Sequence, residues 1–273
     1  MNADDARLQL AYGGLHPERV RDLIAELGSA AAVVRAIGNG SVRTTDRVRA
    51  AVAVDAAVRR PEMRGLGVEF VAKGQPAYPE HLAELPDAPD ALFVRGELPM
   101  TPGVAVVGTR RCTTYGKRLA AAYGRAIGEA GWYLVSGLAR GVDGAAHEGT
   151  VASGARGVAV LGCGIDVAYP PEHAFLGRRL LDLGGAIVTE YPPGTPPEGW
   201  RFPPRNRIIS GLAAAVVVVE AGVKGGALIT AGAALTQGVP VFAVPGDVGR
   251  ASSQGTNLLI RDGAHPVLDA DDL

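Results

Sequence analysis

Apolar segments and polar or glycine-rich loops alternate from residue 103 to the end of the chain. Short apolar runs that are typical of buried strands begin at Val104, Tyr133, Gly157, Ala186, Ala215 and Pro240. Stretches of helical character, such as YGKRLAAAYGRAIGEAG and GALITAGAALTQG, separate them. Strict alternation of strand and helix predicts parallel pairing through right-handed crossovers. We therefore expect residues 103–273 to form an α/β domain with a Rossmann-like, doubly wound and mostly parallel sheet.

Two smaller segments precede this domain. In residues 1–60, apolar positions recur at helical spacing with glycines between them, which predicts a small all-helical domain with tight turns. Residues 61–102 contain many prolines, two short strand candidates at 68–71 and 92–95, and no long helical pattern. We expect this second segment to be a lead-in that packs on the main domain.

Composition narrows the function classes. The 273 residues are 47% hydrophobic and 20% charged, and the formal net charge is -1, so binding of nucleic acid by bulk positive charge is not expected. Two cysteines are too few for a disulfide framework or a cysteine-rich zinc site. The sequence shows no signal-peptide pattern and no uninterrupted apolar run long enough for a membrane span. A cytoplasmic protein without metal, cofactor or membrane partner is the expectation.

Basic residues gather in loops that follow the predicted strands. Residues 101–128 contain no aspartate or glutamate but five basic residues, among them Arg110. Arg205, Arg207 and Lys224 belong to later crossovers, and loops after parallel strands meet at one edge of the sheet. The glycine turn after the first strand also leads into a helix whose N–H groups can bind an anion. The residues therefore favour an anion-binding edge, with a phosphate-rich ligand, over arginines on a solvated helix face.

Other chemistries fit the sequence less well. No G-x-G-x-x-G follows the first strand, which argues against NAD, and Arg118 stands where a P-loop needs serine or threonine, which argues against ATP hydrolysis. His147 and His173 lack metal partners at ligand spacing, so we interpret both as structural. Four carboxylates near the predicted edge either serve catalysis or orient arginines and cap helices, namely Asp143, Asp166, Glu190 and Glu220.

Several motifs, taken in order, resemble one family. VAVVGTRRCTTYG, SGLARGVDGAAH, LGCGIDVAYPPEH, FPPRNRIISGLAAAVVVVEA and a C-terminal set that includes ALITAGAAL and GTNLLIRDGA occur along the chain. Together they resemble the DNA-processing proteins of the DprA family, also called Smf, over nearly the whole length. The N-terminal helices resemble the small SAM-like or helix-hairpin-helix domain of that family.

The resemblance implies a function and a set of residues. Members of this family bind single-stranded DNA in a basic pocket, protect incoming DNA and load RecA onto it in natural transformation, form homodimers and are not known as enzymes. Guanidinium groups match phosphate oxygens, and an aromatic face stacks on an unpaired base. The residues carried over to this pocket and its rim are Gly108, Thr109, Arg110, Ser136, Gly137, Arg201, Phe202, Arg205, Asn206, Arg207 and Lys224.

The chain departs from the family pattern at several positions. Gly225 follows Lys224 where the family usually has serine, so a hydroxyl ligand for phosphate is lost. Near Gly238 the family commonly has an arginine, and this chain has Val239. Thr189 replaces the serine of the usual Ser-Glu pair. The turn at Gly13 differs from the usual hairpin, which argues against duplex binding by the helical domain. The C-terminal winged-helix domain of many members is also not expected here.

An enzyme of related fold is the alternative. Nucleotide phosphoribohydrolases carry P-G-G-x-G-T-x-x-E, in which the glutamate serves catalysis, and the nearest runs here, PPGTPPEG and EAGVKGGALIT, do not match it.

A homodimer is expected through roughly residues 225–264. The helix predicted there has apolar residues on more than one face, which indicates either an interface or a helix packed between layers.

Overall fold

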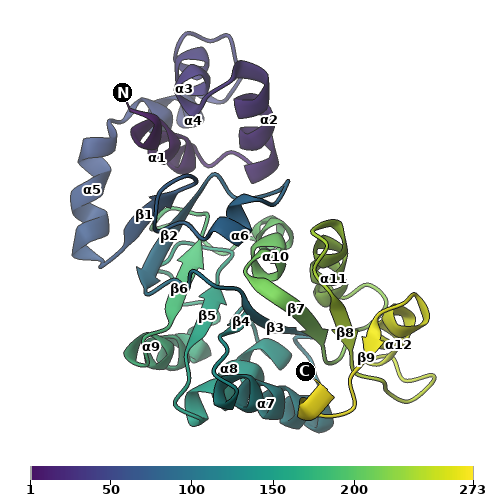
Figure 1. Cartoon of the computed structure of the whole chain (residues 1–273). Helices are drawn as coiled ribbons and strands as arrows, with labels where there is room; N and C mark the ends of the chain where they lie inside the picture. The colour runs from purple at the N-terminus through teal and green to yellow at the C-terminus, as the bar shows by residue number, and fades with distance from the viewer. Residues whose placement is uncertain (1, 273) are drawn as a thin grey trace.

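Five short helices form the N-terminal part of the chain in the computed structural model, which describes residues 2–272, and they lie at one end of a large sheet (Figure 1). Their apolar faces share a core of their own, which includes Leu10, Leu23, Val33 and Ile37. The predicted helical segment is therefore confirmed. The helices are α1 (Ala3–Gly13), α2 (Pro17–Leu27), α3 (Ala30–Gly38), α4 (Asp46–Ala53) and α5 (Ala56–Gly65).

Short polar residues and glycines set the ends of these helices. The side chains of Asn2, Ser29 and Thr45 each accept a hydrogen bond from the backbone N–H three residues further on, which satisfies a free donor of the first turn. Gly14 and Gly28 follow α1 and α2 in the left-handed conformation, which glycine adopts without steric cost. Local sequence thus accounts for the tight turns.

Helix α5 runs through Pro61. The domain boundary predicted between residues 60 and 61 therefore falls inside a helix. Proline removes one hydrogen bond from a helix interior, so it is a frequent signal for a helix end. Here the helix continues to Gly65, and the first strand begins at Glu69.

Nine strands form one sheet in the order β1-β2-β6-β5-β4-β3-β7-β8-β9. β3 to β9 pair in parallel, whereas β1 and β2 pair antiparallel at one edge. This confirms the doubly wound, mostly parallel sheet. The strands are β1 (Glu69–Ala72), β2 (Ala91–Gly96), β3 (Gly103–Val107), β4 (Leu134–Ser136), β5 (Gly157–Val160), β6 (Ala186–Thr189), β7 (Ala213–Val218), β8 (Val241–Ala243) and β9 (His265–Pro266).

The two strands predicted in the lead-in belong to this sheet. β2 pairs with β6 from Phe93↔Thr189 to Gly96↔Ala186, so the lead-in extends the sheet at its edge. The lead-in also fastens the helical region: Arg7 of α1 donates to Asp90 (3.2 Å), and the rings of Tyr12 and Phe93 meet edge to face.

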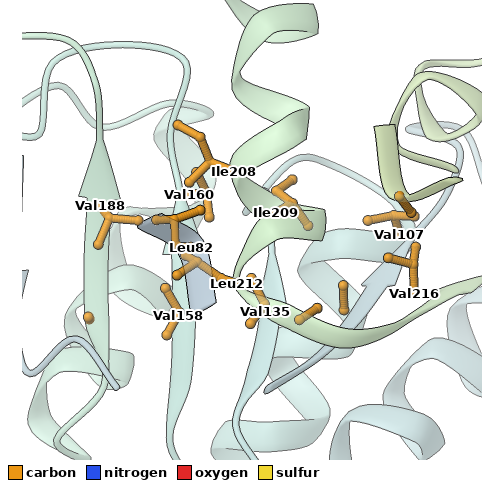
Figure 2. Close-up of a cluster of buried hydrophobic side chains, with 14 of the residues drawn as sticks. Leu82, Val107, Val135, Val158, Val160, Val188, Ile208, Ile209, Leu212 and Val216 are labelled. Carbon is orange, nitrogen blue, oxygen red and sulfur yellow. The ribbon is translucent and has the colours of Figure 1, made fainter. Parts of the chain in front are cut away.

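Helices cover both faces of the sheet. Ile208, Ile209 and Leu212 of the α10 segment pack on valines of β5 and β6, among them Val160 and Val188 (Figure 2). The lead-in contains the short helix α6 (Glu80–Ala83). The helices after it are α7 (Thr114–Glu129), α8 (Val142–Ala152), α9 (Ala174–Asp182), α10 (Phe202–Gly211), α11 (Gly226–Thr236) and α12 (Gln254–Arg261), with single turns η1 (Pro171–His173), η2 (Gly199–Arg201) and η3 (Ala270–Asp272).

Alternate residues of the central strands serve the two faces. Val107 and Val216 pack in the same core as α10 and α11, whereas Val106 and Val217 pack with α7 and α8. This period of two explains why β3 and β7 are apolar without interruption. Within residues 2–272, no helix has both the length and the hydropathy that crossing a membrane requires.

Candidate nucleic-acid interface

The carboxyl ends of β3 and β7 border a cleft of about 500 Å³. These two strands are neighbours, and the strand order reverses between them, because β4, β5 and β6 continue on one side and β8 and β9 on the other. Such a switch point leaves a crevice for ligands. The lining includes Gly108, Thr109 and Arg110 after β3, Phe202, Arg205 and Asn206 of α10, and Gly225 and Gly226 at the start of α11.

Arg205 lies at this cleft although only 4% of the residue is exposed. Its Nη1 donates to the carbonyl oxygens of Gly137 (3.0 Å) and Val160, and its Nε donates to Asn206 Oδ1 (3.2 Å). Burial lowers the pKa of the guanidinium to about 10, although the carboxylate of Asp143 opposes this shift. The group remains charged at neutral pH, so the cleft has a fixed positive charge at its base.

Asp143 is the buried counterpart of this charge. Burial raises the pKa of its carboxyl group, although Arg205 and two backbone N–H groups act in the opposite direction. One of these N–H groups is that of Gly137, at 3.1 Å from Oδ2. A Cβ atom on Gly137 would lie 2.6 Å from Asp143 Oδ2 and 2.7 Å from Arg205 Nη2. A residue without a side chain is therefore needed between the two charges.

Ser136 and Gly137 support the cleft without lining it. Ser136 is fully buried, and its hydroxyl donates to the carbonyl oxygen of Val106 (2.7 Å). Gly137 lines a small adjoining pocket of about 20 Å³, whose walls also include Arg110, Phe202 and Arg205. Gly141, which ends the same loop, has φ 78°, and a Cβ there would lie 2.3 Å from the Thr109 carbonyl oxygen. The loop after β4 therefore packs directly against the loop after β3.

Arg110 and Phe202 form the exposed part of the site. The guanidinium of Arg110 lies 4.8 Å from the centre of the Phe202 ring, in cation–π geometry. Phe202 is half-buried and Arg110 is exposed, so both remain accessible from solvent. A cation beside an aromatic face is an arrangement that binds a phosphate and a base together.

Tyr169 is a member of this group that sequence reasoning missed. Its ring lies 5.4 Å from that of Phe202, and Gly162 leaves room for the Phe202 ring, since a Cβ there would approach it to 2.7 Å. The sequence does contain a signal for Tyr169, because this residue stands in the loop after the third parallel strand, at the edge where the site was expected. Sequence alone did not show that this loop reaches Phe202.

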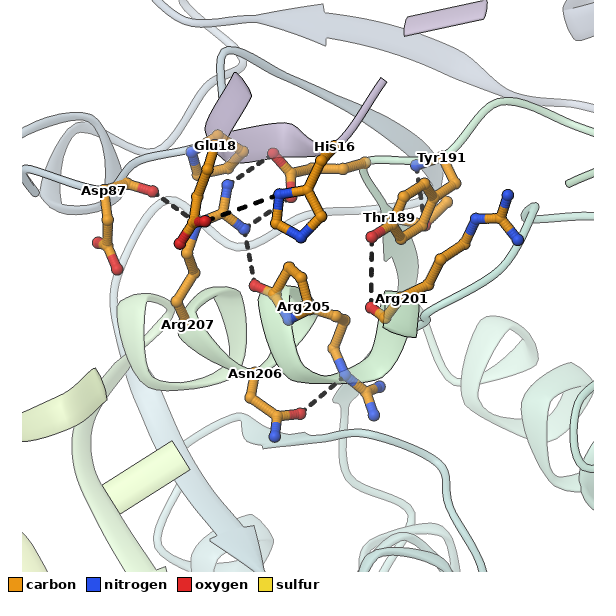
Figure 3. Close-up of polar contacts among 12 residues, drawn as sticks. His16, Glu18, Asp87, Thr189, Tyr191, Arg201, Arg205, Asn206 and Arg207 are labelled. Carbon is orange, nitrogen blue, oxygen red and sulfur yellow. Dashed lines mark hydrogen bonds and ion pairs between the residues drawn. The ribbon is translucent and has the colours of Figure 1, made fainter. Parts of the chain in front are cut away.

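Arg207 does not line the cleft, contrary to expectation. Its two terminal nitrogens donate to the carboxylate of Glu190 (2.6 and 2.7 Å), and its Nε donates to the carbonyl oxygen of Asp87 (2.8 Å). Figure 3 shows Arg207 directed toward Asp87, with Arg205 and Asn206 on the other side of the helix. Two residues along a helix turn by about 200°, so the guanidinium groups at 205 and 207 cannot share one face.

Arg201 and Lys224 have different surroundings. Arg201 packs its guanidinium against the rings of Trp200 (4.5 Å) and Tyr191 (5.6 Å), on the side of η2 away from the cleft. Lys224 is exposed and directly precedes two glycines that line the cleft, and it makes no ion pair within residues 2–272. The structure therefore leaves Lys224 at the rim and separates Arg201 from the group.

The expected anion site at the start of α7 is wrong, because the chain caps this helix itself. Glu220 accepts hydrogen bonds from the N–H (2.8 Å) and hydroxyl (2.5 Å) of Thr113, and the Thr113 hydroxyl accepts from Gly116 N–H (3.1 Å). Helix α11 differs: its N-cap is Gly225, which supplies no side chain, and its first residues line the cleft. Free N–H groups and the helix dipole there favour an anion.

The four carboxylates have structural partners, as expected under one of the two interpretations that the sequence left open. Glu190 pairs with Arg207, Glu220 caps α7, and Asp143 lies beside Arg205. Asp166 accepts from the N–H of Gly194 (2.8 Å). They orient arginines and backbone groups. The described part of the chain contains no cluster of three or more His, Cys, Asp or Glu residues that could hold a metal.

The fold and the cleft define a Rossmann-like protein with a cleft lined by arginines at the switch point of its sheet. Residues 69–273 match the family model for DNA recombination-mediator protein A. The chain therefore belongs to the DNA recombination-mediator protein A family, which confirms the resemblance to DprA and Smf proteins.

Individual relatives support this assignment. The chain is 43% identical to the Smf protein of Escherichia coli strain K12 over 72% of its own length and 53% of that protein, so it spans about half of this relative. It is 40% identical to the DNA processing protein DprA of Streptococcus pneumoniae over 72% of this chain and 70% of that one.

Two solved structures are also similar. The X-ray structure of DprA from Streptococcus pneumoniae matches with a TM-score of 0.80 and 31% identity, covering 97% of this chain and 94% of that one. DNA processing protein A from Helicobacter pylori, described for its single-stranded DNA binding mode, matches with a TM-score of 0.66 and 28% identity, over 75% and 93% of the two chains.

Proposed function

We propose that this protein binds single-stranded DNA in the cleft at the ends of β3 and β7. The observation that carries this proposal is the contact between Arg110 and Phe202 at the mouth of a cleft with the buried charge of Arg205 at its base. A phosphate oxygen accepts from Arg110, Lys224 and the first N–H groups of α11, while an unpaired base stacks near Phe202. Bases in a duplex are already stacked, so a duplex gains less from this aromatic face.

Two further facts support a local site. The net charge of -1 excludes binding through bulk charge, so affinity must come from a cluster such as this one. The Helicobacter pylori relative is described as a single-stranded DNA binder. None of the contacts that we invoke needs a base edge to be read, so little sequence preference is expected.

The test is a fluorescence-anisotropy titration with single- and double-stranded oligonucleotides of equal length at several salt concentrations. Single strands should bind more tightly, and the logarithm of affinity should fall linearly with the logarithm of salt. Arg110→Ala and Lys224→Ala should each weaken binding and reduce the salt slope by about one. Arg43→Ala removes an exposed arginine of the helical region and is the matched control. Equal affinity for duplex and single strand would contradict the proposal.

We further propose that the bound strand is handed to RecA during transformation or recombination, and that the protein acts as a homodimer. Ile229 and Leu235 of α11 are 47% and 66% exposed, and the opposite face of the helix packs on the sheet. Of the two interpretations of this helix, an interface is favoured over burial between two layers. The measurement for RecA is strand exchange on DNA coated with single-strand binding protein, with and without this protein.

A role in binding without catalysis completes the proposal. The carboxylates near the cleft are held by internal partners, so none of Asp143, Asp166, Glu190 and Glu220 is placed as a free general base. Incubation with nucleoside monophosphates, with and without magnesium, should release neither free base nor phosphate. Release in proportion to purified protein would favour the phosphoribohydrolase alternative.

A further inference from the structure

A second cleft, of about 600 Å³, lies between the N-terminal helices and the segment that follows β6. Residues of α1, α2 and α4 form one wall, and residues 190–201 form the other. None of the residues carried over from the family resemblance lines it except Arg201. The cleft is therefore distinct from the candidate site at β3 and β7.

Its unpaired charges are positive. The three carboxylates of the lining each pair with an arginine, in the pairs Asp90–Arg7, Glu190–Arg207 and Glu198–Arg201. Arg21 and Arg47 also line the cleft, and neither makes an ion pair within residues 2–272. The lining thus has four arginines against three carboxylates. Arg47 also acts on the charge of Glu198, whereas Arg21 makes no ion pair within the described residues.

Two buried nitrogens in this lining lack acceptors. Arg21 Nη1 and Arg201 Nε are inaccessible to solvent, and neither donates a hydrogen bond within the described part of the chain. Buried N–H groups of charged side chains are nearly always hydrogen-bonded in proteins. Acceptor oxygens of a ligand in the cleft would satisfy both arginines if their side chains turned toward it.

The wall between the two clefts is a single stretch of chain. Pro197, Gly199 and Phe202 line the cleft at β3 and β7, whereas Trp200 and Arg201 line the second cleft. Residues 199–201 form a 3₁₀ turn, and neighbouring residues of this stretch line opposite clefts, so the wall between the clefts is one segment of chain. A chain-like polyanion in one cleft can continue into the other.

We propose that the second cleft is an extension of the strand-binding site, in which Arg21 and Arg47 bind phosphates of the single strand after it leaves Phe202. This inference rests on the proposed function and makes the N-terminal helices part of the DNA-binding surface. A long single strand contacts both clefts, whereas a strand of a few nucleotides fills only the first. Length dependence is therefore the property that separates the two clefts.

The first experiment compares three charge variants of the full chain on oligothymidylates of about 6 and about 30 nucleotides. The double variant Arg21→Ala/Arg47→Ala should bind the long strand about tenfold more weakly, with a salt slope lower by about two, and should bind the short strand like wild type. Arg19→Ala/Arg43→Ala removes the same charge from exposed positions outside the cleft, in α2 and in the loop before α4. This control variant should bind both strands like wild type. Arg110→Ala should weaken both lengths.

The second readout uses Trp200, which is 40% exposed beside the cleft. The chain has two tryptophans, so Trp132→Phe leaves Trp200 as the only one. The long strand should change its fluorescence and the short strand should not. Two results together would overturn the proposal for the second cleft: unchanged Trp200 fluorescence, and equal affinities of the Arg21/Arg47 and Arg19/Arg43 variants for the long strand. If binding still depends on Arg110 in that case, the proposed site in the first cleft stands. A polyglutamate peptide that changes Trp200 fluorescence when the long strand does not would assign the cleft to an acidic protein instead.

Discussion

Arg110 and Arg205 have the same charge but opposite surroundings, and this difference predicts different consequences of mutation. Arg110 is exposed and touches one aromatic ring, so its loss removes a ligand contact. Arg205 is buried, and it holds the carbonyl oxygens of Gly137 and Val160 and lies beside Asp143. Its loss leaves the buried carboxyl group of Asp143 without its charged neighbour and removes a donor from two carbonyl oxygens.

We predict that Arg205→Ala lowers the free energy of unfolding by about 3 kcal/mol, as expected when one partner of a buried charge pair is removed. Arg110→Ala should leave it unchanged and weaken strand binding about tenfold, through loss of one charge-assisted contact. Urea unfolding and anisotropy on the same samples measure both quantities. Equal stability of the two variants would show that Arg205 does not hold the loop after β4.

Gly137→Ala should impair both stability and binding. The new Cβ would lie within 2.7 Å of charged atoms of Asp143 and Arg205, so the loop or the arginine must move. Gly232→Ala is the control, since nothing lies within 4 Å of a Cβ there and a helix interior gains about 0.5–1 kcal/mol from alanine. In thermal melts the two variants should shift in opposite directions, and in short-strand titrations only Gly137→Ala should bind more weakly.

At the scale of elements, the helices around the cleft begin in two ways. Helix α7 is capped from within by Thr113 and Glu220, so its dipole is neutralised by the chain. Helix α11 begins at Gly225 without a side-chain cap and opens on the cleft. The same structural motif, a strand followed by a helix, therefore has a capped helix start after β3 and an uncapped one at the cleft after β7.

Glu220→Ala should lower the free energy of unfolding by about 1–2 kcal/mol, the range for loss of a helix cap. Glu129→Ala removes the same charge from the last turn of α7, where a carboxylate opposes the helix dipole, and should change stability by less than about 0.5 kcal/mol. Circular dichroism during chemical unfolding is the measurement. A similar effect of the two substitutions would contradict the capping role.

At the scale of the whole molecule, acid should destabilise the fold through His147. Burial, with a smaller effect of His173, lowers the pKa of His147 to about 3, whereas the unfolded side chain accepts a proton near pH 6.5. The unfolded state therefore binds more protons between these values, and His147 costs up to about 1.4 kcal/mol of stability per pH unit as pH falls through this window.

His147→Leu should flatten this dependence between pH 6.5 and 3 relative to wild type. His265→Gln changes an exposed histidine and should leave the curve as it is. Unfolding by urea at a series of pH values gives both curves. Parallel curves for His147→Leu and wild type would show that His147 does not contribute to the pH dependence.

The proposed dimer makes a prediction at the same scale. Leu235→Glu places a charge on the exposed face of α11, so it should lower the association constant by at least tenfold without lowering monomer stability. Val58→Glu changes an equally exposed residue of α5 and should have no effect. Sedimentation equilibrium over a wide concentration range measures the association. A wild-type protein that is monomeric at the highest concentration would rule the dimer out.

The sequence by itself determined the layers and the edge where the site lies. Periods of two and of helical spacing depend only on local geometry, so β3 to β8 and the helices between them could be predicted. The same order of elements predicted that Arg110 and Arg205 lie at one edge, whereas Phe202 was expected there only from the family resemblance. The last strand, β9, has two residues and gave no such signal.

Tertiary structure decided which charges face a ligand. Arg205 and Arg207 are two residues apart in one motif, yet Glu190, directly after β6, and Asp87, in the lead-in, hold Arg207 away from the cleft. Glu220 reaches Thr113 only because β7 pairs with β3, and Tyr169 meets Phe202 only because β5 and α10 are brought together. These partners are far apart in the chain, so each side chain's role depends on contacts that no local pattern specifies.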